Sequence, residues 1–319
     1  MKKGGRPVPQ KIILDCDPGI DDALAIVFAW GHPDLEILGI TTVAGNVSLD
    51  KTTANALRVC EFIGAADVPV VAGSPRPLLR PPLTSRGPHG ESGLAGARLP
   101  PPTTPPRGGH AVDFLAETIG AAPGEIILIA TGPLTNVALA VRRQPELARQ
   151  VRDFVIMGGS AGRGNVTPAA EFNIAADPEA ASIVFGAGWT VTMVGLDVTL
   201  RARAGPAVRQ RLGALGRLAD DLLLPCLARY TTTSGPDGPA VHDVCAVAHV
   251  ASARLLGCVP ARVEVETAGR WTAGMTVTDF AGAGPECNAQ VAVEIDTAAF
   301  WDVVLAAYSR VAAAMDTDH

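Results

Sequence analysis

Short apolar runs alternate with segments of helical length over the first 196 residues, and this alternation constrains the fold more than any other feature. Strands that alternate with helices imply a mostly parallel sheet covered by helices on both faces. The runs that predict strands cover residues 11–15, 35–43, 68–72, 125–130, 151–157 and 190–196. The segments that predict helices cover residues 21–30, 49–63, 110–119, 133–143 and 178–185.

The pattern changes in the last third of the chain. It predicts a largely helical stretch, then an antiparallel set of strands, then a final helix, over residues 209–230, 259–267, 275–280, 290–295 and 297–314. No internal repeat or linker divides the chain. We therefore expect an α/β fold with one large domain over residues 1–319. Its Rossmann-like sheet is open and mostly parallel, with a small additional strand and helix region near the C-terminus.

One segment breaks the alternation. Residues 74–109 are rich in Pro, Gly and Arg and carry no periodicity. Loops of this length inside a compact domain are usually functional or disordered. We expect this segment to be a mobile flap over an active site.

The composition excludes several classes of function. The chain has a formal net charge of -6, so it lacks the basic surface that binds nucleic acid or an anionic membrane. No apolar stretch approaches the ~20 residues of a membrane span, and the run at residues 12–14 is too short for a signal peptide. Six cysteines form no CxxC pair, which favours reduced thiols in a cytoplasmic protein.

A polar segment directly follows the end of each of four predicted strands. These segments read DCDPGIDD from residue 15, AGN from residue 44, TGPLTN from residue 131 and GG from residue 158. In an open α/β sheet, ligands bind beyond the carboxyl ends of the strands. We therefore expect these four segments to converge on one pocket.

The first of these segments holds four carboxylates within eight residues: Asp15, Asp17, Asp21 and Asp22. Crowding them in one crevice is unfavourable unless a cation neutralises them. Oxygen ligands alone indicate a hard ion, Ca²⁺ or Mg²⁺, in preference to zinc. Asp21 and Asp22 also fit an ordinary helix N-terminus, but that interpretation leaves Asp15 and Asp17 unexplained.

Two further segments are candidates for the same site. Val241-His242-Asp243 opens an apolar helix after a Gly- and Pro-rich turn, and AEFN at residues 170–173 follows a Gly-rich stretch. Taken alone, each has an ordinary explanation: a surface histidine, an acid at a helix N-terminus, or a loop.

Taken together, these segments resemble the inosine–uridine-preferring nucleoside hydrolase family. The resemblance rests on IILDCDPGIDDALAI, ITTVAGN, HGESG, TGPLTN, MGG with AEFNIAADPEAA, VGLDVT and VHDVCAVA, in the family's order over nearly the whole chain. It implies hydrolysis of the N-glycosidic bond of ribonucleosides of the inosine or uridine type, purine or pyrimidine, to free base and ribose. It also implies a homodimer or homotetramer.

The resemblance assigns a Ca²⁺ site and the catalytic residues. Asp17, Asp22, the carbonyl of Thr131 and Asp243 match the family's calcium ligands. Asp17 matches the general base that activates a calcium-bound water. His242, with an ordinary pKa near working pH, is the candidate that protonates the departing base.

The remaining site residues follow from the same resemblance. The positions that match ribose contacts are Asp21, Asn46, Glu171 and Asn173, with further sugar contacts at Met157 and Asn165. His89 and His242 match positions near the leaving base. Tyr230 is the candidate for stacking on the base, because the region before His242 holds no other aromatic residue.

Two alternatives remain open from the sequence. A phosphatase of the haloacid-dehalogenase type also places DxD after its first strand, but it has Thr or Val where this chain has Gly19. The second alternative is a non-catalytic nucleoside- or sugar-binding protein on the same fold. That alternative would be favoured if Asp17 or His242 were missing, and both are present.

Overall fold

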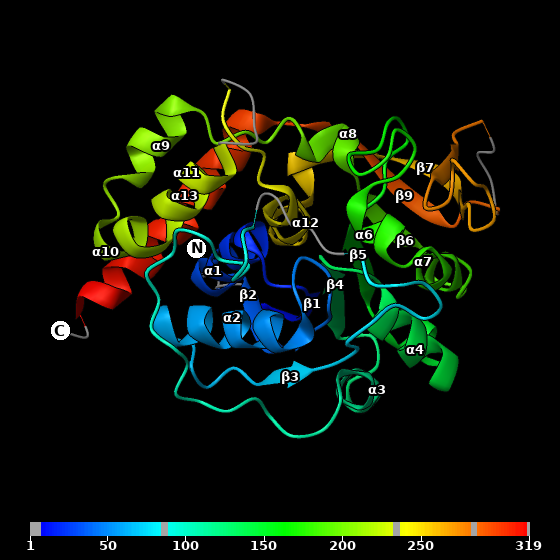
Figure 1. Cartoon of the computed structure of the whole chain (residues 1–319), viewed down its shortest axis with the longest axis horizontal. Coiled ribbons are helices and arrows are strands. Elements are labelled where there is room, and N and C mark those ends of the chain that lie inside the picture. The colour runs from blue at the N-terminus through cyan, green and yellow to red at the C-terminus, as the bar shows by residue number, and fades with distance from the viewer. Residues whose placement is uncertain (1–7, 84–88, 232–236, 282–285, 318–319) are drawn as a thin grey trace, which may run out of the picture.

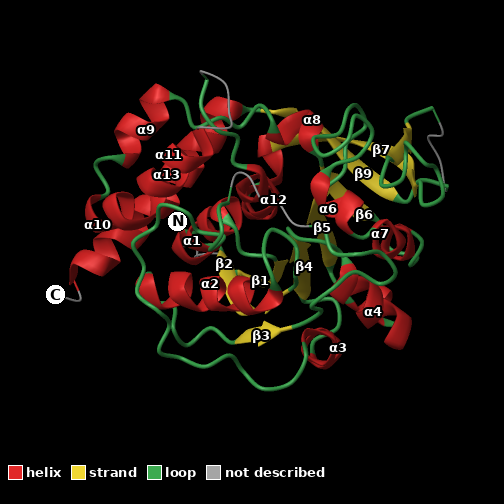
Figure 2. Cartoon of the chain, viewed as in Figure 1, coloured by secondary structure: helices red, strands yellow, loops and turns green. Residues whose placement is uncertain are grey.

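The computed structural model describes residues 8–83, 89–231, 237–281 and 286–317. In this part of the chain, nine strands form one sheet in the order β3-β2-β1-β4-β5-β6-β9-β7-β8 (Figure 2). The strands are β1 (Gln10–Cys16), β2 (Leu35–Thr42), β3 (Val70–Ala72), β4 (Ile126–Ala130), β5 (Asp153–Met157), β6 (Val191–Val194), β7 (Leu256–Val265), β8 (Thr276–Asp279) and β9 (Ala289–Ile295). Neighbours from β3 to β9 pair in parallel, whereas β7 is antiparallel to both β9 and β8. The mostly parallel α/β sheet expected from the sequence is confirmed.

Helices connect the strands and surround the sheet (Figure 1). They are α1 (Ile20–Gly31), α2 (Leu49–Phe62), α3 (Ala111–Ala121), α4 (Thr135–Arg143), α5 (Leu147–Gln150), α6 (Phe172–Ala176), α7 (Pro178–Phe185), α8 (Leu196–Thr199), α9 (Pro206–Leu212), α10 (Gly216–Leu218), α11 (Leu224–Thr231), α12 (His242–Ala251) and α13 (Thr297–Thr317). A π-helical turn, η1 (Ala219–Leu223), and a 3₁₀ turn, η2 (Ala253–Leu255), complete the set.

The two faces of the sheet carry separate cores. Side chains alternate between the faces along a strand, so Ile12 and Leu14 of β1 enter one core while Ile13 enters the other. The first core contains residues of α1, α2, α12 and α13, and the second contains residues of α3, α4 and α7. Both faces are therefore covered by helices, which gives each strand its continuous apolar sequence.

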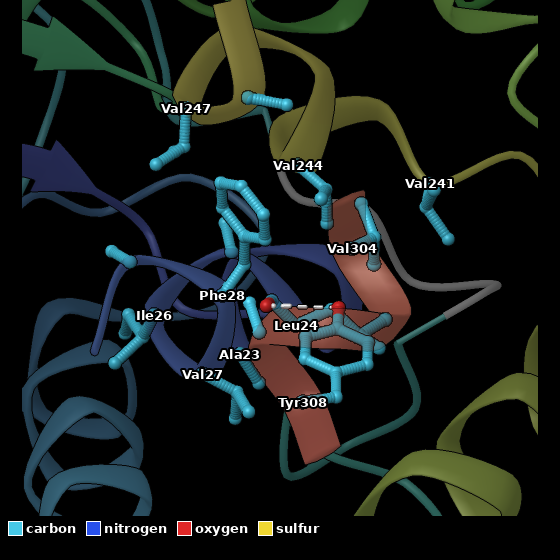
Figure 3. Close-up of a cluster of buried hydrophobic side chains, with 14 of the residues drawn as sticks. Ala23, Leu24, Ile26, Val27, Phe28, Val241, Val244, Val247, Val304 and Tyr308 are labelled. Carbon is cyan, nitrogen blue, oxygen red and sulfur yellow. Dashed lines mark hydrogen bonds between the residues drawn. The ribbon is translucent and has the colours of Figure 1, made fainter. Parts of the chain in front are cut away.

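Helix α1 carries the end of the acidic motif and is buried along nearly its whole length, with only Trp30 exposed. Its apolar side chains pack against α12 and α13, and the Tyr308 hydroxyl donates a hydrogen bond to the Leu24 carbonyl at 3.1 Å (Figure 3). Each large side chain buried here contributes about 1.5–3 kcal/mol. This packing holds the first turn of α1, with Asp21 and Asp22, in a fixed place.

The helical stretch expected over residues 209–230 is broken into several pieces. Helix α9 ends at Leu212, and the chain restarts at Gly216, which has a φ of +51°. A π-helical turn then precedes Pro225 in α11. Proline cannot donate the hydrogen bond of an α-helix, and such turns accommodate an interrupted bonding ladder.

The expected antiparallel set is confirmed for β7, which pairs with β8 and β9, but β9 also pairs in parallel with β6. The C-terminal strands therefore extend the main sheet. Helix α13 is long and apolar enough to cross a membrane by length and composition alone. Its Phe300 and Tyr308 are buried in the core beside α1, so it packs as a core helix.

The segment expected to form a flap connects β3 to α3. Residues 84–88 lie outside the described residues, and residues 74–83 and 89–109 contain neither a helix nor a named strand. Among its described side chains, those of Ser74, His89 and Leu94 are buried. This loop therefore contributes to the interior next to α1, while its mobility stays a prediction.

Candidate active site

A cavity of about 470 Å³ opens at the carboxyl edge of the parallel strands. Strand β1 lies between β2 and β4, so the chain reverses its direction across the sheet at β1, where α/β folds bind ligands. The cavity is lined by Asp21, Asn46, His89, Thr131, Met157, Asn165, Val166, Glu171, Phe172, Asn173, Leu200, Arg203, Tyr230, Ala240, His242 and Asp243. The sequence predicted that four polar segments, beginning at residues 15, 44, 131 and 158, converge on one pocket. All four contribute to this cavity or lie directly beneath it.

Three carboxylates meet at one side of the cavity. Asp21, Asp22 and Asp243 are buried, and one oxygen atom from each lies within 4.8 Å of the others. Burial, followed by the charge of Asp22, raises the pKa of Asp21 to about 8. Burial and the charges of the neighbouring acids also raise the pKa of Asp243 well above its usual value. A cation would remove this repulsion and hold the carboxylates in their charged form.

Asp17 lies beneath these acids, and only one of its two carboxylate oxygens has a hydrogen-bond partner among the described residues. Its Oδ2 accepts a hydrogen bond from the Asn46 backbone N–H at 2.6 Å, while its Oδ1 is buried and has no hydrogen-bond partner among the described residues. A Cβ atom at Gly45 or Gly132 would collide with this carboxylate, so both glycines permit the close approach of the backbone. A buried oxygen without a donor requires a ligand such as a cation or water.

Asp22 is fixed from several sides. Its Oδ2 accepts hydrogen bonds from the Gly19 N–H at 3.0 Å and the Asn46 side chain at 3.2 Å, and its Oδ1 accepts from the Thr131 hydroxyl at 2.9 Å. Asn46 therefore contacts both Asp17 and Asp22. The loop after β2 and the turn after β4 together set the spacing between these two acids.

Asp15 serves a different purpose from the other acids in its motif. It is fully buried, and its Oδ1 accepts hydrogen bonds from the Thr41 hydroxyl at 2.6 Å and the Asn136 side chain at 2.8 Å. Burial raises its pKa to about 6. These contacts join β1, β2 and the start of α4, so Asp15 supports the sheet edge on which the site stands.

Glu171 and Asn173 form the cavity wall next to the acidic turn. Glu171 caps α6 by accepting hydrogen bonds from the backbone N–H groups of Asn173 at 2.9 Å and Ile174 at 3.2 Å, and it also accepts one from the Gly159 N–H at 2.9 Å. The Asn173 side chain donates to the carbonyls of Thr131 at 2.7 Å and Met157 at 3.1 Å. Both side chains are therefore held in fixed orientations at the cavity wall.

Asn165 and Met157 line the same wall. Asn165 Oδ1 accepts a hydrogen bond from the Phe172 N–H at 2.9 Å. The Met157 sulfur lies 3.6 Å from the Asn173 side-chain nitrogen. Both residues expected to contact the sugar therefore lie next to Glu171 and Asn173.

His242, His89 and Tyr230 lie together in the cavity, and this histidine end borders the acid cluster, with His89 Nδ1 4.0 Å from Asp21 Oδ1. His242 Nδ1 lies 2.8 Å from the Thr199 hydroxyl, and His89 Nδ1 accepts a hydrogen bond from the Ile20 N–H at 3.0 Å. The rings of His89 and Tyr230 are 5.5 Å apart. These three residues come from α12, the loop after β3 and α11, which are far apart in the sequence.

Both histidines are neutral at neutral pH. Burial, followed by the positive charge of Arg203, lowers the pKa of His242 to about 4. Burial, followed by the charge of His242, lowers the pKa of His89 to about 4 as well. The sequence suggested a histidine with a pKa near working pH, and burial removes that property.

Several lining residues were not identified from the sequence. They are Val166, Phe172, Leu200, Arg203 and Ala240, together with Thr199 beneath His242. Thr199 closes the VGLDVT motif and Phe172 lies within AEFN, so both belong to segments that the sequence analysis singled out without a role for these residues. Val166, Leu200, Arg203 and Ala240 follow no local pattern, because only the tertiary fold brings them to the cavity.

A buried carboxylate cluster at the carboxyl edge of a parallel sheet, inside a cavity of a size that suits one small molecule, is typical of an α/β enzyme. Comparison with known proteins then identifies the family. The family model described as inosine-uridine preferring nucleoside hydrolase matches residues 12–302. The chain belongs to this family and is an enzyme, a nucleoside hydrolase.

Individual relatives agree with this assignment. An inosine-uridine preferring nucleoside hydrolase from Leishmania major is 44% identical over 95% of this chain and 99% of the relative. The pyrimidine-specific ribonucleoside hydrolase RihA from Salmonella arizonae is 44% identical over 92% of this chain and 96% of the relative.

A solved structure, the purine-preferring ribonucleoside hydrolase from Gardnerella vaginalis, matches with a TM-score of 0.89. It is 32% identical and covers 95% of this chain and 99% of its own. The names of these three relatives differ in the base that they prefer. Membership of the family therefore does not fix the base.

Proposed function

We propose that this enzyme hydrolyses ribonucleosides of the inosine or uridine type with a Ca²⁺ ion held by Asp17, Asp22, the Thr131 carbonyl and Asp243, and with Asp17 as the general base. The observation that carries this proposal is the bare, buried Oδ1 atom of Asp17 beneath three clustered carboxylates. No other group among the described residues satisfies that oxygen.

The donor set fits a hard divalent cation. It consists of carboxylate and carbonyl oxygens, with no sulfur or nitrogen, which favours Ca²⁺ over zinc. The residues come from the turn after β1, the end of β4 and the start of α12, and all are buried. When bound, such a cation neutralises the carboxylates and acidifies the water beside them.

Asp17 has the geometry of a base. The Asn46 N–H anchors its Oδ2 and so fixes the carboxylate; with Oδ1 directed to the proposed cation, the carboxylate would lie beside the cation-bound water and accept its proton. As the O–C1′ bond forms, the C1′–N bond to the base breaks, and its electron pair leaves with the base.

The rigid wall of the cavity orients the ribose. We assign the 2′-hydroxyl to Asp21, with Asn46 beside it, and the other end of the sugar to Glu171 and Asn173. Met157 and Asn165 extend that wall. These side chains are held before substrate binds, so little entropy is lost when the sugar docks.

The base then lies at the end occupied by His89, Tyr230 and His242. The neutral His242 imidazole has Nδ1 against Thr199, so Nε2 is the atom left for the departing base. We assign His242 as the residue that protonates that base: Nε2 takes up a proton from solvent when the nucleoside binds and donates it as the C1′–N bond breaks. Tyr230 is the aromatic surface beside the base. His89 is the second candidate for protonation.

The remaining features of the account stay predictions. We expect a homodimer or homotetramer in the cytoplasm, with a small ribonucleoside as the substrate and with neither nucleic acid nor membrane as a partner. Residues 74–109 are expected to act as a mobile flap over the cavity.

Metal removal tests the proposal. We expect exhaustive chelation of the purified enzyme to abolish hydrolysis of inosine, uridine and p-nitrophenyl riboside, and added Ca²⁺ to restore it. Full turnover by protein with no measurable metal would contradict the proposal. A matched incubation without chelator controls for loss of the protein itself.

A further inference from the structure

Arg203 is the one permanently charged cation among the cavity-lining residues that the structure describes. It lies four residues after Thr199, and its charge acts on His242. Although five acidic residues line or adjoin the same cavity, Arg203 forms no ion pair with a carboxylate among the described residues. It therefore belongs to the histidine end of the cavity and does not neutralise the acid cluster.

The backbone around Arg203 is fixed by a short antiparallel pairing. Residues 202–204 pair with residues 239–241 through two backbone hydrogen bonds, Ala204 N–H to Pro239 at 2.8 Å and Val241 N–H to Ala202 at 3.0 Å. The second of these segments leads directly into His242. The position of Arg203 is therefore fixed relative to the histidine end.

The guanidinium group retains donors for a ligand. Its Nη1 donates to the Gly238 carbonyl at 2.8 Å, which is its single side-chain hydrogen bond among the described residues. Arginine carries five N–H donors in a planar fork and has no acceptor. The remaining donors are available to an acceptor that enters the cavity.

A nucleobase offers either an acceptor or a donor at this position. Hypoxanthine and uracil carry an exocyclic oxygen at ring position 6 or 4, whereas adenine and cytosine carry an amino group there. When an amino group faces arginine, both groups present N–H donors and neither offers an acceptor, so no hydrogen bond can form between them. A site that loses a designed hydrogen bond in this way rejects the analogue strongly.

The geometry points to Arg203 as a specificity-determining residue that donates hydrogen bonds to the exocyclic oxygen of the base and so selects oxo bases over amino bases. This inference rests on the proposed placement of the ribose at the acid cluster. The base departs with the electron pair of the C1′–N bond, and part of its negative charge reaches the exocyclic oxygen. A fixed guanidinium there stabilises that charge as it develops.

The test compares inosine with adenosine, which differ at ring position 6. We expect Arg203→Leu to lower the ratio of their kcat/KM values by about 10–100-fold, the range for loss of hydrogen bonds to a charged group. The loss falls on inosine, while adenosine changes by less than about threefold. Uridine and cytidine should show the same pattern at ring position 4.

Two further variants sharpen the result. Arg201→Leu removes the same charge from an exposed side chain outside the cavity, and we expect it to leave the inosine-to-adenosine ratio unchanged. Arg203→Lys keeps the charge without the planar fork, so it should retain part of the ratio.

Three outcomes separate the possibilities. An unchanged ratio in Arg203→Leu overturns the inference. An equal loss on inosine and adenosine also overturns it, because Arg203 would then act only through its bond to Gly238. Failure of the calcium-loaded wild-type enzyme to hydrolyse any nucleoside would instead contradict the proposed function, and the two failures are therefore distinguishable.

Discussion

The two ends of the cavity are built in different ways. At the acid end, Asp22, Glu171 and Asn173 each form two or more hydrogen bonds to groups at strand ends and helix starts. At the base end, His242 and Arg203 each form one side-chain hydrogen bond among the described residues. The contacts proposed for the sugar and the metal thus lie at the sheet edge, whereas those proposed for the base lie on segments beyond it. Relatives that share the fold but are named for different bases agree with this division.

The largest effect should appear when the substrate loses its contact with the acid end. If Asp21 and the cation grip the 2′-hydroxyl, a 2′-deoxynucleoside leaves buried charged groups unpaired. We expect kcat/KM for 2′-deoxyuridine to fall by roughly 10⁴-fold relative to uridine. Comparable values for the two substrates, measured on the same calcium-loaded preparation, would contradict the placement of Asp21.

Asp17→Asn tests the general base at the same end. The substitution keeps the shape of the side chain but removes its basicity, and we expect kcat to fall by roughly 10²–10⁴-fold. Calcium content must be measured in parallel, because part of the loss can come from weaker binding. A kcat near that of the wild type, with calcium still bound, would remove Asp17 from this role.

His242→Ala tests the base end and should have a smaller, substrate-dependent effect. Inosine and uridine have poor leaving groups that need a proton, so we expect a loss of about 10²-fold. Nitrophenolate is stable as an anion, so cleavage of p-nitrophenyl riboside should change little. An equal loss on both classes of substrate would make His242 structural or sugar-binding, and no loss on either would favour His89.

The sequence predicted the fold best where periodicity extends over a whole element. The strands and helices up to residue 196 lie close to their expected positions, because each has enough residues to show its period. Helices α6 and α8 were missed because they contain only five and four residues. The helix predicted over residues 209–230 is interrupted near Gly216 and near Pro225. The apolar pattern continues across both residues, so it did not reveal these interruptions.

One part of the site could likewise be predicted from the sequence, and another part could not. The acid end follows from motifs at strand ends, since parallel strands bring their carboxyl ends to one edge. The base end does not, because Arg203 and Ala240 reach the cavity through a short backbone pairing that no local pattern encodes. The low pKa of His242 also depends on tertiary burial and could not be read from its place in the sequence.

Calcium binding to the metal-free protein distinguishes a metal site from a cluster of acids that binds no ion. Titration calorimetry on chelated wild-type enzyme should show one Ca²⁺ site per chain, and Asp22→Ala should weaken or abolish it while the melting profile remains cooperative. Arg201→Leu, a change outside the cavity, should bind as the wild type does. Absence of calcium binding to the wild type, or undiminished binding to Asp22→Ala, would contradict the assignment of this cluster as the metal site.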